Sequence, residues 1–396
     1  MTQVQQPTAA QQAAKMQAAN MQARQLVVQN AYPMIQQIFN STIQPASQNV
    51  LNIPPQNVGL IKGFLVKVSA LVTNPAAGSS QLNLTAQGAS NILQNILFTD
   101  LQNYQRINTS GWHLSMLNSA KQGRPFLSST ASDSPMGYGS NYTVVKAPAT
   151  IAVNTTGTVQ MYFWVPLSYT DTDLTGAIYA NVVNATMNMQ LTFAQAATAV
   201  VANTGDPTLA IYQGAGAVAG VTLTNLTTTV YQMYYDQLPM GQNGPILPAI
   251  DLSSIYEIKN TAFTGLTVGQ DFNMAYSNFR HFLSTCLIYD DQTGGAYPAA
   301  GSDVNYFSLR TANYTDARKA DPATWAGLAR RKFMTDVPVG AYYFDHRDKP
   351  IYTTQFGNMN LVLNPSTVNT GAQCLVGWEM IANVNNLVNA GSLASS

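Results

Sequence analysis

The stretch GQNGPILPAIDL, residues 241–252, interrupts an otherwise strand-rich chain near its middle. Its conformationally special residues are Gly241, Asn243, Gly244, Pro245 and Pro248. The glycines and the asparagine can adopt positive φ, while each proline fixes φ and removes a backbone donor, so no helix or central strand should run through here. About 200 residues of β-like sequence precede the stretch and about 140 follow it. Each block is long enough to bury its own core, and we predict a short, stiff joint between two domains.

The block before the joint contains short runs of alternating polarity. In IKGFLVKVSALVTN, residues 61–74, apolar Val66 and Val68 alternate with Lys67 and Ser69 before a turn-rich segment. This period of two predicts strands with one buried face. Similar runs are Ile92–Phe98, Trp112–Leu117, Tyr142–Val145, Val159–Val165, Met187–Phe193 and Val221–Leu238.

The block after the joint repeats this pattern. Its strand-like runs are Phe272–Tyr276, Phe282–Tyr289, Val304–Leu309, Ala341–Phe344, Ile351–Phe356, Met359–Leu363 and Cys374–Ile381. The segment Asp345-His346-Arg347-Asp348 reads as a polar turn between two of these strands. Each block thus offers about seven or eight strands, as a β-sandwich or an eight-stranded jelly roll requires. The pattern lacks the repeated crossover helices that a parallel sheet needs.

Helices are expected at three places. Residues 12–31 are rich in Gln and Ala and predict a helix that ends by Pro33. Its apolar stripe is weak, so neighbouring molecules or a surface beneath the molecule should order it; a disordered low-complexity tail is the alternative, and disorder is expected for the first ten residues. Asp206-Pro207 and Asp321-Pro322 each place a capping carboxylate before a proline, which predicts two further helix starts.

The second of these helices should end in three basic residues, Arg330, Arg331 and Lys332. Cations in a last turn oppose the helix dipole favourably. A basic patch for a ligand is the less favoured alternative.

Charge is scarce, because Asp, Glu, Lys and Arg make up 9% of the chain and the formal net charge is zero. A surface of this kind suits packing against copies of the same protein, although a polar β protein with neutral loops fits the composition equally. No acidic residue precedes Asp100, whereas Lys15, Arg24, Lys62 and Lys67 do. Four cations are too few for a nucleic-acid groove, but they can help one end of the molecule lie near anionic lipid. Solvated cations on a neutral tail are the simpler alternative.

The sequence offers no catalytic constellation. Its histidines are His113, His281 and His346, and its cysteines are Cys286 and Cys374. No histidine has a second His or Cys at the spacing that metal ligands require, and both cysteines sit in apolar runs typical of buried positions. GAGAVAG, residues 214–220, lacks the spacing of a phosphate loop and leads into a strand. We predict no enzyme, no cofactor site and no metal site. Without a signal-peptide core or an 18-residue apolar run, synthesis inside the cell is expected.

Several longer blocks of sequence together resemble one family. They are SGWHLSM (110–116), AKQGRPFLSS (120–129), TDLTGAIYANV (172–182), AIYQGAGA (210–217), YDQLPMGQNGPILPAIDLS (235–253), RTANYTDARKADPATWA (310–326) and RDKPIYTTQFGN (347–358). In this order, and over essentially the whole chain, the sequence is similar to the major capsid proteins of tectiviruses, tailless icosahedral bacteriophages with an internal membrane. Departures fall in loops such as NPAAGSS and NPSTVNTG.

The resemblance implies an all-β double jelly roll with an N-terminal helix and short flanking helices. It also implies homotrimers of nearly hexagonal outline that tile an icosahedral shell, with synthesis in the host bacterial cytoplasm. Minor capsid, vertex and membrane proteins are further possible partners, and no sequence-specific nucleic-acid binding is expected. The expected segments are an arm and helix (1–40), a first jelly roll (41–240), a linker (241–248), a second jelly roll (249–384) and a tail (385–396).

The resemblance places the N-terminal helix at the base of the molecule, toward the membrane and neighbouring trimers. The residues expected to face them are Lys15, Met16, Met21 and Arg24. The residues expected to set the joint between the barrels are Gly241, Gly244, Pro245 and Pro248.

Two other functions are weighed against the shell protein. A tandem β-sandwich that binds carbohydrate as a lectin or adhesin would need clustered exposed tryptophans, but the four lie apart at 112, 164, 325 and 378. A hydrolase on a β scaffold ranks last, since no nucleophile–base pair is recognisable.

Overall fold

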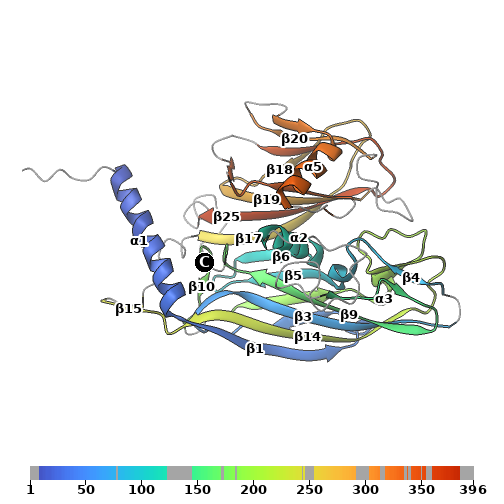
Figure 1. Ribbon diagram of the computed structural model, residues 1–396, viewed down its shortest axis with the longest axis horizontal. Coiled ribbons are helices and arrows are strands. Elements are labelled where there is room, and N and C mark those ends of the chain that lie inside the picture. Colours follow the sequence, from blue (N-terminus) through green and yellow to red (C-terminus); the bar gives the residue numbers. More distant parts are fainter. Residues whose placement is uncertain are drawn as a thin grey trace, which may run out of the picture.

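Two β-barrels lie one above the other, with a long helix, α1 (Ala9–Asn30), standing beside them (Figure 1). This computed structural model describes residues 9–76, 79–122, 145–170, 174–182, 185–242, 244–245, 254–290, 303–312, 317–333, 337, 340–348, 350–353 and 359–383.

The first barrel has eight principal strands. They are β1 (Tyr32–Ile43), β2 (Val50–Ile53), β3 (Leu60–Asn74), β5 (Leu93–Thr99), β6 (Gln105–Thr109), β9 (Thr155–Pro166), β11 (Asn188–Phe193) and β14 (Thr222–Asp236). One sheet has the order β1-β14-β3-β9, which are the first, eighth, third and sixth of these strands along the chain. The other has the order β2-β11-β5-β6, which are the second, seventh, fourth and fifth. All neighbours within these two sheets pair antiparallel.

The second barrel also has eight principal strands. They are β17 (Ser254–Phe263), β18 (Phe272–Ala275), β19 (Arg280–Asp290), β20 (Val304–Arg310), β21 (Ala317–Ala320), β22 (Ala341–Asp345), β24 (Asn360–Pro365) and β25 (Gln373–Asn383). Their order repeats that of the first barrel, strand for strand. Two facing sheets of four antiparallel strands with this connectivity form a jelly roll, so the chain is a double jelly roll as expected.

Shorter elements decorate the barrels. They are β4 (Leu82–Leu84), η1 (Gly88–Ile92), α2 (Gly111–Gln122), β7 (Val145–Lys146), β8 (Thr150–Ile151), β10 (Ile178–Tyr179), α3 (Ala196–Ala199), β12 (Val200–Val201), β13 (Tyr212–Gly214), β15 (Met240–Gly241), β16 (Gly244–Pro245), α5 (Pro322–Phe333) and β23 (Ile351–Tyr352). β4, β8, β12 and β13 form a small separate sheet.

Each barrel encloses its own apolar core, the first centred on residues such as Phe64, Phe98 and Phe193 and the second on Phe307 and Trp378. In β3 the predicted alternation is confirmed. Val66 and Val68 are buried, while Lys67 and Ser69 between them are only partly covered. The expected strands at β5, β11, β14, β18, β19, β20, β22, β24 and β25 are also present within one or two residues of their predicted ends. The expected strand at β9 is present too, but it begins at Thr155, four residues before its predicted start at Val159.

One sheet is shared by the two barrels. Strand β6, at the edge of the first jelly roll, pairs parallel with β17, at the edge of the second, through Ile107 opposite Ile258 and Asn108 opposite Lys259. Four strands of each barrel thereby join one continuous sheet, to which β23 adds a ninth strand. The edge strands β6 and β17 satisfy each other's backbone hydrogen-bonding groups, and this pairing holds the barrels at a fixed angle.

The predicted N-terminal helix is confirmed, and it ends at Asn30, before Pro33. The strand that follows it, β1, was not predicted. A register shift between Gln37 and Phe39 breaks its alternation, and it pairs on one side only, with β14. A bulged edge strand that begins near a proline gives little periodic signal.

The prediction of a strand at Trp112–Leu117 was wrong, because these residues lie in helix α2. Trp112, Leu114 and Met116 alternate with polar residues and imitate a strand. Residues 111–120 are all buried, however, so the helix has no solvent face and therefore no amphipathic stripe.

Of the two predicted helix starts, the second is confirmed and the first is wrong. Pro322 opens α5, and the backbone N–H of Thr324 donates to Asp321 Oδ1 at 2.9 Å. Asp206 Oδ1 instead accepts from the backbone N–H of Thr208 at 2.9 Å, and this local bond stabilises a turn with no helix after it.

The joint begins as a two-residue ribbon. Met240 and Gly241 in β15 pair antiparallel with Pro245 and Gly244 in β16, and Gly244 has a φ of +117°, which suits glycine. Figure 1 shows β15 at an outer corner of the first barrel, beside the end of α1. Pro248 and the rest of residues 246–253 lie outside the described residues, so the stiffness of the joint stays a prediction.

Candidate functional site

Helix α2 of the first barrel packs against the second barrel, and this contact is the first candidate site (Figure 1). Its Trp112 and Met116 side chains join a buried cluster with Ile288 of β19, Phe333 of α5 and Tyr343 of β22. An apolar cluster shared by two barrels resists their separation, because parting them would expose it to water.

On the same helix, His113 lies against the backbone of β25. A Cβ atom added at Gly377 would lie 2.4 Å from the His113 ring, so only glycine lets the strand and the ring meet. The ring's Nδ1 is 2.6 Å from Thr109 Oγ1.

A buried carboxylate in the second barrel is neutralised by a lysine from the first. Lys121 Nζ, in the last turn of α2, lies 2.9 Å from Glu379 Oε1 in β25. Tyr256 donates to the same oxygen at 2.7 Å, and Ser284 donates to Oε2 at 2.7 Å. Lys121 also donates to the backbone carbonyl of Tyr169 at 2.6 Å. Glu379 is completely buried and Lys121 is 14% exposed, so this ion pair crosses the barrel junction with little screening.

A second buried carboxylate, Glu257 of β17, sits at the other side of the junction. Arg280 Nε donates to its Oε2 at 2.7 Å, and Lys259 Nζ donates to its Oε1 at 2.9 Å. Tyr104 of the first barrel also donates to Oε1, and its hydroxyl accepts from Arg280 at 3.3 Å. Burial and the neighbouring carboxylate raise the pKa of Tyr104, so its hydroxyl stays protonated and keeps donating.

Both carboxylates are held ionised in spite of burial. Burial alone would raise the pKa of each, but Lys121 and Arg347 lower the pKa of Glu379, and Lys259 and Arg280 lower that of Glu257. Burial lowers the pKa of His113 to about 4, so its ring is neutral when the protein is folded.

We expect the protein to lose stability steadily as the pH falls below 6.5. An unfolded His113 takes up a proton near pH 6.5, whereas the folded one resists until about pH 4, which removes about 3 kcal/mol of unfolding free energy by pH 4. Below the ordinary Glu pKa of 4.5, Glu257 and Glu379 add to the loss, because their folded pKa values are lowered and the unfolded chain protonates first. Urea unfolding at pH 7, 5.5 and 4 measures this. The His113→Gln variant should show a flatter dependence between pH 6.5 and 4, and an unchanged dependence would contradict the assignment.

The predicted polar turn at 345–348 is confirmed and belongs to the same junction. Arg347 forms two bonds to the Asp345 carboxylate, at 3.1 and 2.6 Å, and reaches the Ala120 carbonyl of α2 at 3.3 Å. Lys332 at the end of α5 lies 3.0 Å from Asp345 and 2.9 Å from Asp348. Lys332 of the predicted basic trio is thus paired within the chain, which agrees with a structural role.

The corner of the first barrel where α1 ends is the second candidate site. Lys15 of α1 is exposed and Arg24 is partly exposed, whereas the side chains of Met16 and Met21 lie outside the described set. The end of the helix is anchored, since Val27 and Ala31 are buried against Leu60, Leu174 and Tyr235. All four residues expected to face a partner lie on α1. Of the linker residues, Gly241 is exposed and Gly244 is partly exposed.

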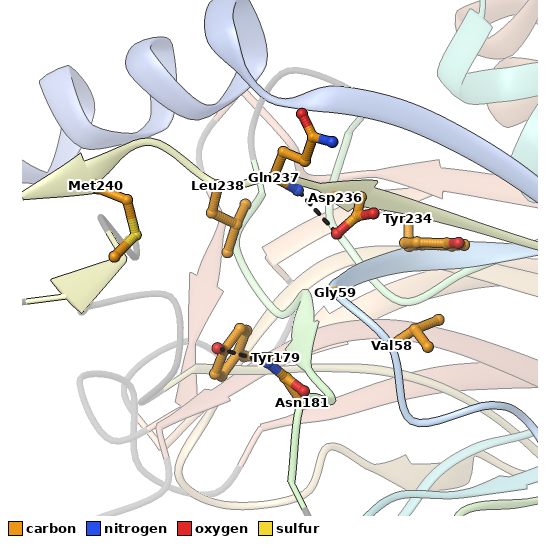
Figure 2. Close-up of a pocket in the computed structure, with 9 residues that line it drawn as sticks. All are labelled: Val58, Gly59, Tyr179, Asn181, Tyr234, Asp236, Gln237, Leu238 and Met240. Atoms are coloured by element: carbon orange, nitrogen blue, oxygen red, sulfur yellow. Dashed lines mark hydrogen bonds between the residues drawn. The ribbon is translucent and has the colours of Figure 1, made fainter.

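A pocket of about 470 Å³ opens beside this anchored turn (Figure 2). Its walls are Val58, Gly59, Tyr179, Asn181, Tyr234, Asp236, Gln237, Leu238 and Met240. Asp236 is the only charged side chain among them, and its Oδ1 accepts from the backbone N–H of Gln237 at 2.8 Å. The pocket was not predicted, because its walls come from three separate segments of the chain.

The described residues show no arrangement suited to catalysis or metal binding. They contain no group of three or more His, Cys, Asp or Glu side chains that could hold an ion. Cys286 and Cys374 are buried and unpaired, and burial raises their thiol pKa values well above the ordinary range. His346 is buried with its pKa lowered to about 3. None of the described helices is both long and apolar enough to cross a bilayer.

The fold and this barrel junction define a class of protein, the viral double jelly-roll capsid subunit. The chain belongs to the P3 major capsid protein family, and its role is that of a structural capsid protein. Residues 2–238 match the family model "P3 major capsid protein N-terminal", and residues 253–395 match "P3 major capsid protein C-terminal". The major capsid protein P3 of Enterobacteria phage PRD1, a tectivirus, is 50% identical, with all of both chains aligned.

Solved structures support the fold. A structure of Sulfolobus turreted icosahedral virus matches with a TM-score of 0.63 at 10% identity, covering 90% of this chain and 93% of the other. A quasi-atomic structure of the PBCV-1 virus capsid matches with a TM-score of 0.55 at 10% identity, covering 89% and 96%. These structures confirm the expected fold class. The family models and the relative from phage PRD1 confirm the expected resemblance, the structural, non-enzymatic capsid role and the place in the virion capsid.

Proposed function

We propose that the chain forms a homotrimer whose six jelly rolls give a nearly hexagonal outline, and that these trimers tile an icosahedral shell over an internal membrane. The observation that carries this proposal is the rigid union of two barrels in one chain. Joined by a shared sheet and by α2, they supply two corners of a hexagon at a set angle. Subunits of capsid proteins associate with their own copies, and a closed three-fold ring is the simplest arrangement that uses both barrels.

The uncharged surface favours such an assembly. Charged residues are 9% of the chain, and several of them form ion pairs inside the barrel junction. The outer surface therefore carries few charges to desolvate when copies meet. Light scattering on the purified protein should give about three times 42.6 kDa. A persistent monomer at micromolar concentration would reject the trimer, and negative-stain images without a three-fold hexagonal outline would reject the geometry.

The proposal includes a base that faces the membrane and neighbouring trimers through the N-terminal helix, with Lys15, Met16, Met21 and Arg24 as the facing residues. It keeps the expected division into arm (1–40), first jelly roll (41–240), linker (241–248), second jelly roll (249–384) and tail (385–396), although strand β1 (Tyr32–Ile43) already pairs within the first jelly roll. Synthesis in the host cytoplasm, and contacts with minor capsid, vertex or membrane proteins, belong to the same proposal.

Deleting residues 1–30 should leave the trimer intact but impair shell assembly or membrane association. The reason is that the described apolar contacts between α1 and the first barrel lie near the end of the helix, through residues such as Val27. A shorter deletion of residues 1–22 keeps that turn and serves as the matched control for lost anchoring. Light scattering and particle yield measure the two effects. Loss of the trimer in the shorter deletion would show that the exposed part of α1 belongs to the subunit interface.

The carbohydrate-binding alternative has no observation in its favour. Trp112, Trp164 and Trp378 are buried, so they cannot form a stacking platform for sugars.

A further inference from the structure

Exposed apolar side chains gather at the corner of the first barrel where α1 ends and β1 begins. Of ten large apolar residues exposed in the described part of the chain, four lie here: Tyr32 at 63%, Met34 at 41%, Ile35 at 58% and Met240 at 73%. Tyr32 in β1 lies opposite Asp236 in β14, and Asp236 lines the pocket. Met240 lines the pocket as well. We call Tyr32, Met34, Ile35, Met240 and the pocket the apolar corner. A patch of this kind on a soluble chain commonly marks an interaction surface.

The pocket at the apolar corner has a distinct chemistry. Figure 2 shows Leu238 and Tyr179 facing each other across it, with Met240 beside them and Asp236 on the neighbouring segment. Tyr179 accepts a weak bond from Asn181 at 3.4 Å. The pocket thus offers apolar walls, amide and hydroxyl groups and one negative charge. None of its lining residues is basic, which disfavours an anionic lipid headgroup as its occupant.

Helix α1 has the complementary surface. Lys15, Ala18, Ala19 and Gln22 are exposed, and no acidic residue occurs in the helix. A helix with so few large apolar side chains is marginal in water by itself, so contacts must stabilise the turns that leave the barrel. None of the described residues that line the pocket belongs to α1.

We propose that the apolar corner of one copy binds the exposed turns of α1 of a second copy. Small Ala side chains let the helix approach the wall formed by Leu238 and Met240. Lys15 brings a positive charge to Asp236, since no described lining residue of the pocket is basic. The proposal rests on the self-assembly proposed above and adds its receptor site. It commits to a second copy because the chain is a capsid subunit that contacts copies of itself, and because the charges of helix and pocket are opposite.

Disulfide trapping between two single-cysteine variants tests the proposal. One variant carries Ala18→Cys and the other carries Met240→Cys, and both are exposed positions. The native Cys286 and Cys374 are buried and do not compete. The variants are co-expressed at full length, then mildly oxidised both as purified oligomer and as assembled shells. Because each chain has one accessible thiol, a mixed disulfide can form only between copies. Mass spectrometry of the linked peptides identifies it.

The control pair is Ala18→Cys with Val268→Cys, which is 54% exposed on the second barrel. The mixed disulfide with Met240→Cys should exceed the control pair severalfold. Adding Asp236→Lys to the Met240→Cys variant should lower its yield about two- to fivefold, the worth of an exposed ion pair. Placing Lys15→Glu on the other variant should restore the yield.

A mixed disulfide no more abundant than the control, in both oligomer and shell, overturns the proposal. A dominant link between two Met240→Cys chains overturns it as well, since the corner would then meet another corner. Protection of the Met240→Cys thiol by vesicles, without a mixed disulfide, assigns the corner to lipid and also overturns it. These failures are distinct from failure of the trimer, which light scattering reports on unmodified protein.

Discussion

Replacing Lys121 by methionine is expected to lower the free energy of unfolding by about 3–5 kcal/mol. The substitution leaves the carboxylate of Glu379 completely buried without the cation that lies 2.9 Å from it. Tyr256 and Ser284 would still donate to the carboxylate, but neutral donors compensate a buried charge incompletely. The packing of the aliphatic stem is kept by methionine, so the loss reports on charge. Denaturant unfolding of the purified variant measures it.

Two further variants make this result specific. Lys259→Met removes a cation from the other buried carboxylate, Glu257, which keeps Arg280 at 2.7 Å, so a loss of about 1 kcal/mol or less is expected. Adding Glu379→Gln to Lys121→Met removes the orphaned charge and should recover much of the loss. If Lys121→Met is as mild as Lys259→Met, or if the second substitution recovers nothing, then the ion pair does not stabilise the junction as argued.

The ion pair between Lys121 and Glu379 is one of the contacts that hold the two barrels together. The linker prolines were expected to set the angle between the barrels, and for residues 246–253 that prediction stays open. The described contacts lie elsewhere, in the parallel pairing of β6 with β17 and in α2 with Lys121. The two barrels therefore form a single body whether the connecting segment is stiff or not.

The sequence predicted the double jelly roll well, because strands with one solvent face keep a period of two. β3 shows this in its alternation from Val66 to Val72. The short strands β2 and β6 were missed although their burial alternates, and three longer elements failed because they do not face solvent in a regular way. Helix α2 is buried on all sides, and the edge strand β1 has a register shift. β17 was also missed, since its buried residues, including Glu257, follow one another without alternation.

The junction and the pocket depend on tertiary contacts that local patterns do not encode. One signal was available: in a chain with so few charges, Glu257 and Glu379 each sit within an apolar run, IYEIKN and VGWEMI. A carboxylate in such a run must be buried with a cation, or the strand would not form. Which cation pairs with it, Lys121 or Lys259, depends on how the barrels meet, and the sequence does not reveal that.

Replacing Gly377 by alanine is the second change expected to have a large effect. The new Cβ would lie 2.4–2.5 Å from three atoms of the His113 ring. Strand β25 cannot move away easily, because Gly377 pairs with Asn260 of β17 on one side and Cys286 of β19 on the other. Helix α2 cannot move easily either, since Trp112 and Met116 are packed in the shared cluster. Overpacking of this kind costs about 1–3 kcal/mol, with the upper end expected here.

Gly327→Ala is the matched control, because a Cβ at that position in α5 meets no atom within 4 Å. Alanine inside a helix is favoured over glycine by about 1 kcal/mol, so the same chemical change should stabilise the protein there. His113→Ala combined with Gly377→Ala should destabilise less than the sum of the two single substitutions, since removing the ring removes the clash. Thermal and urea unfolding of the four variants tests the argument. Strict additivity, or a neutral Gly377→Ala, would mean that the strand and the helix adjust to each other and that their close approach does not hold the barrels together.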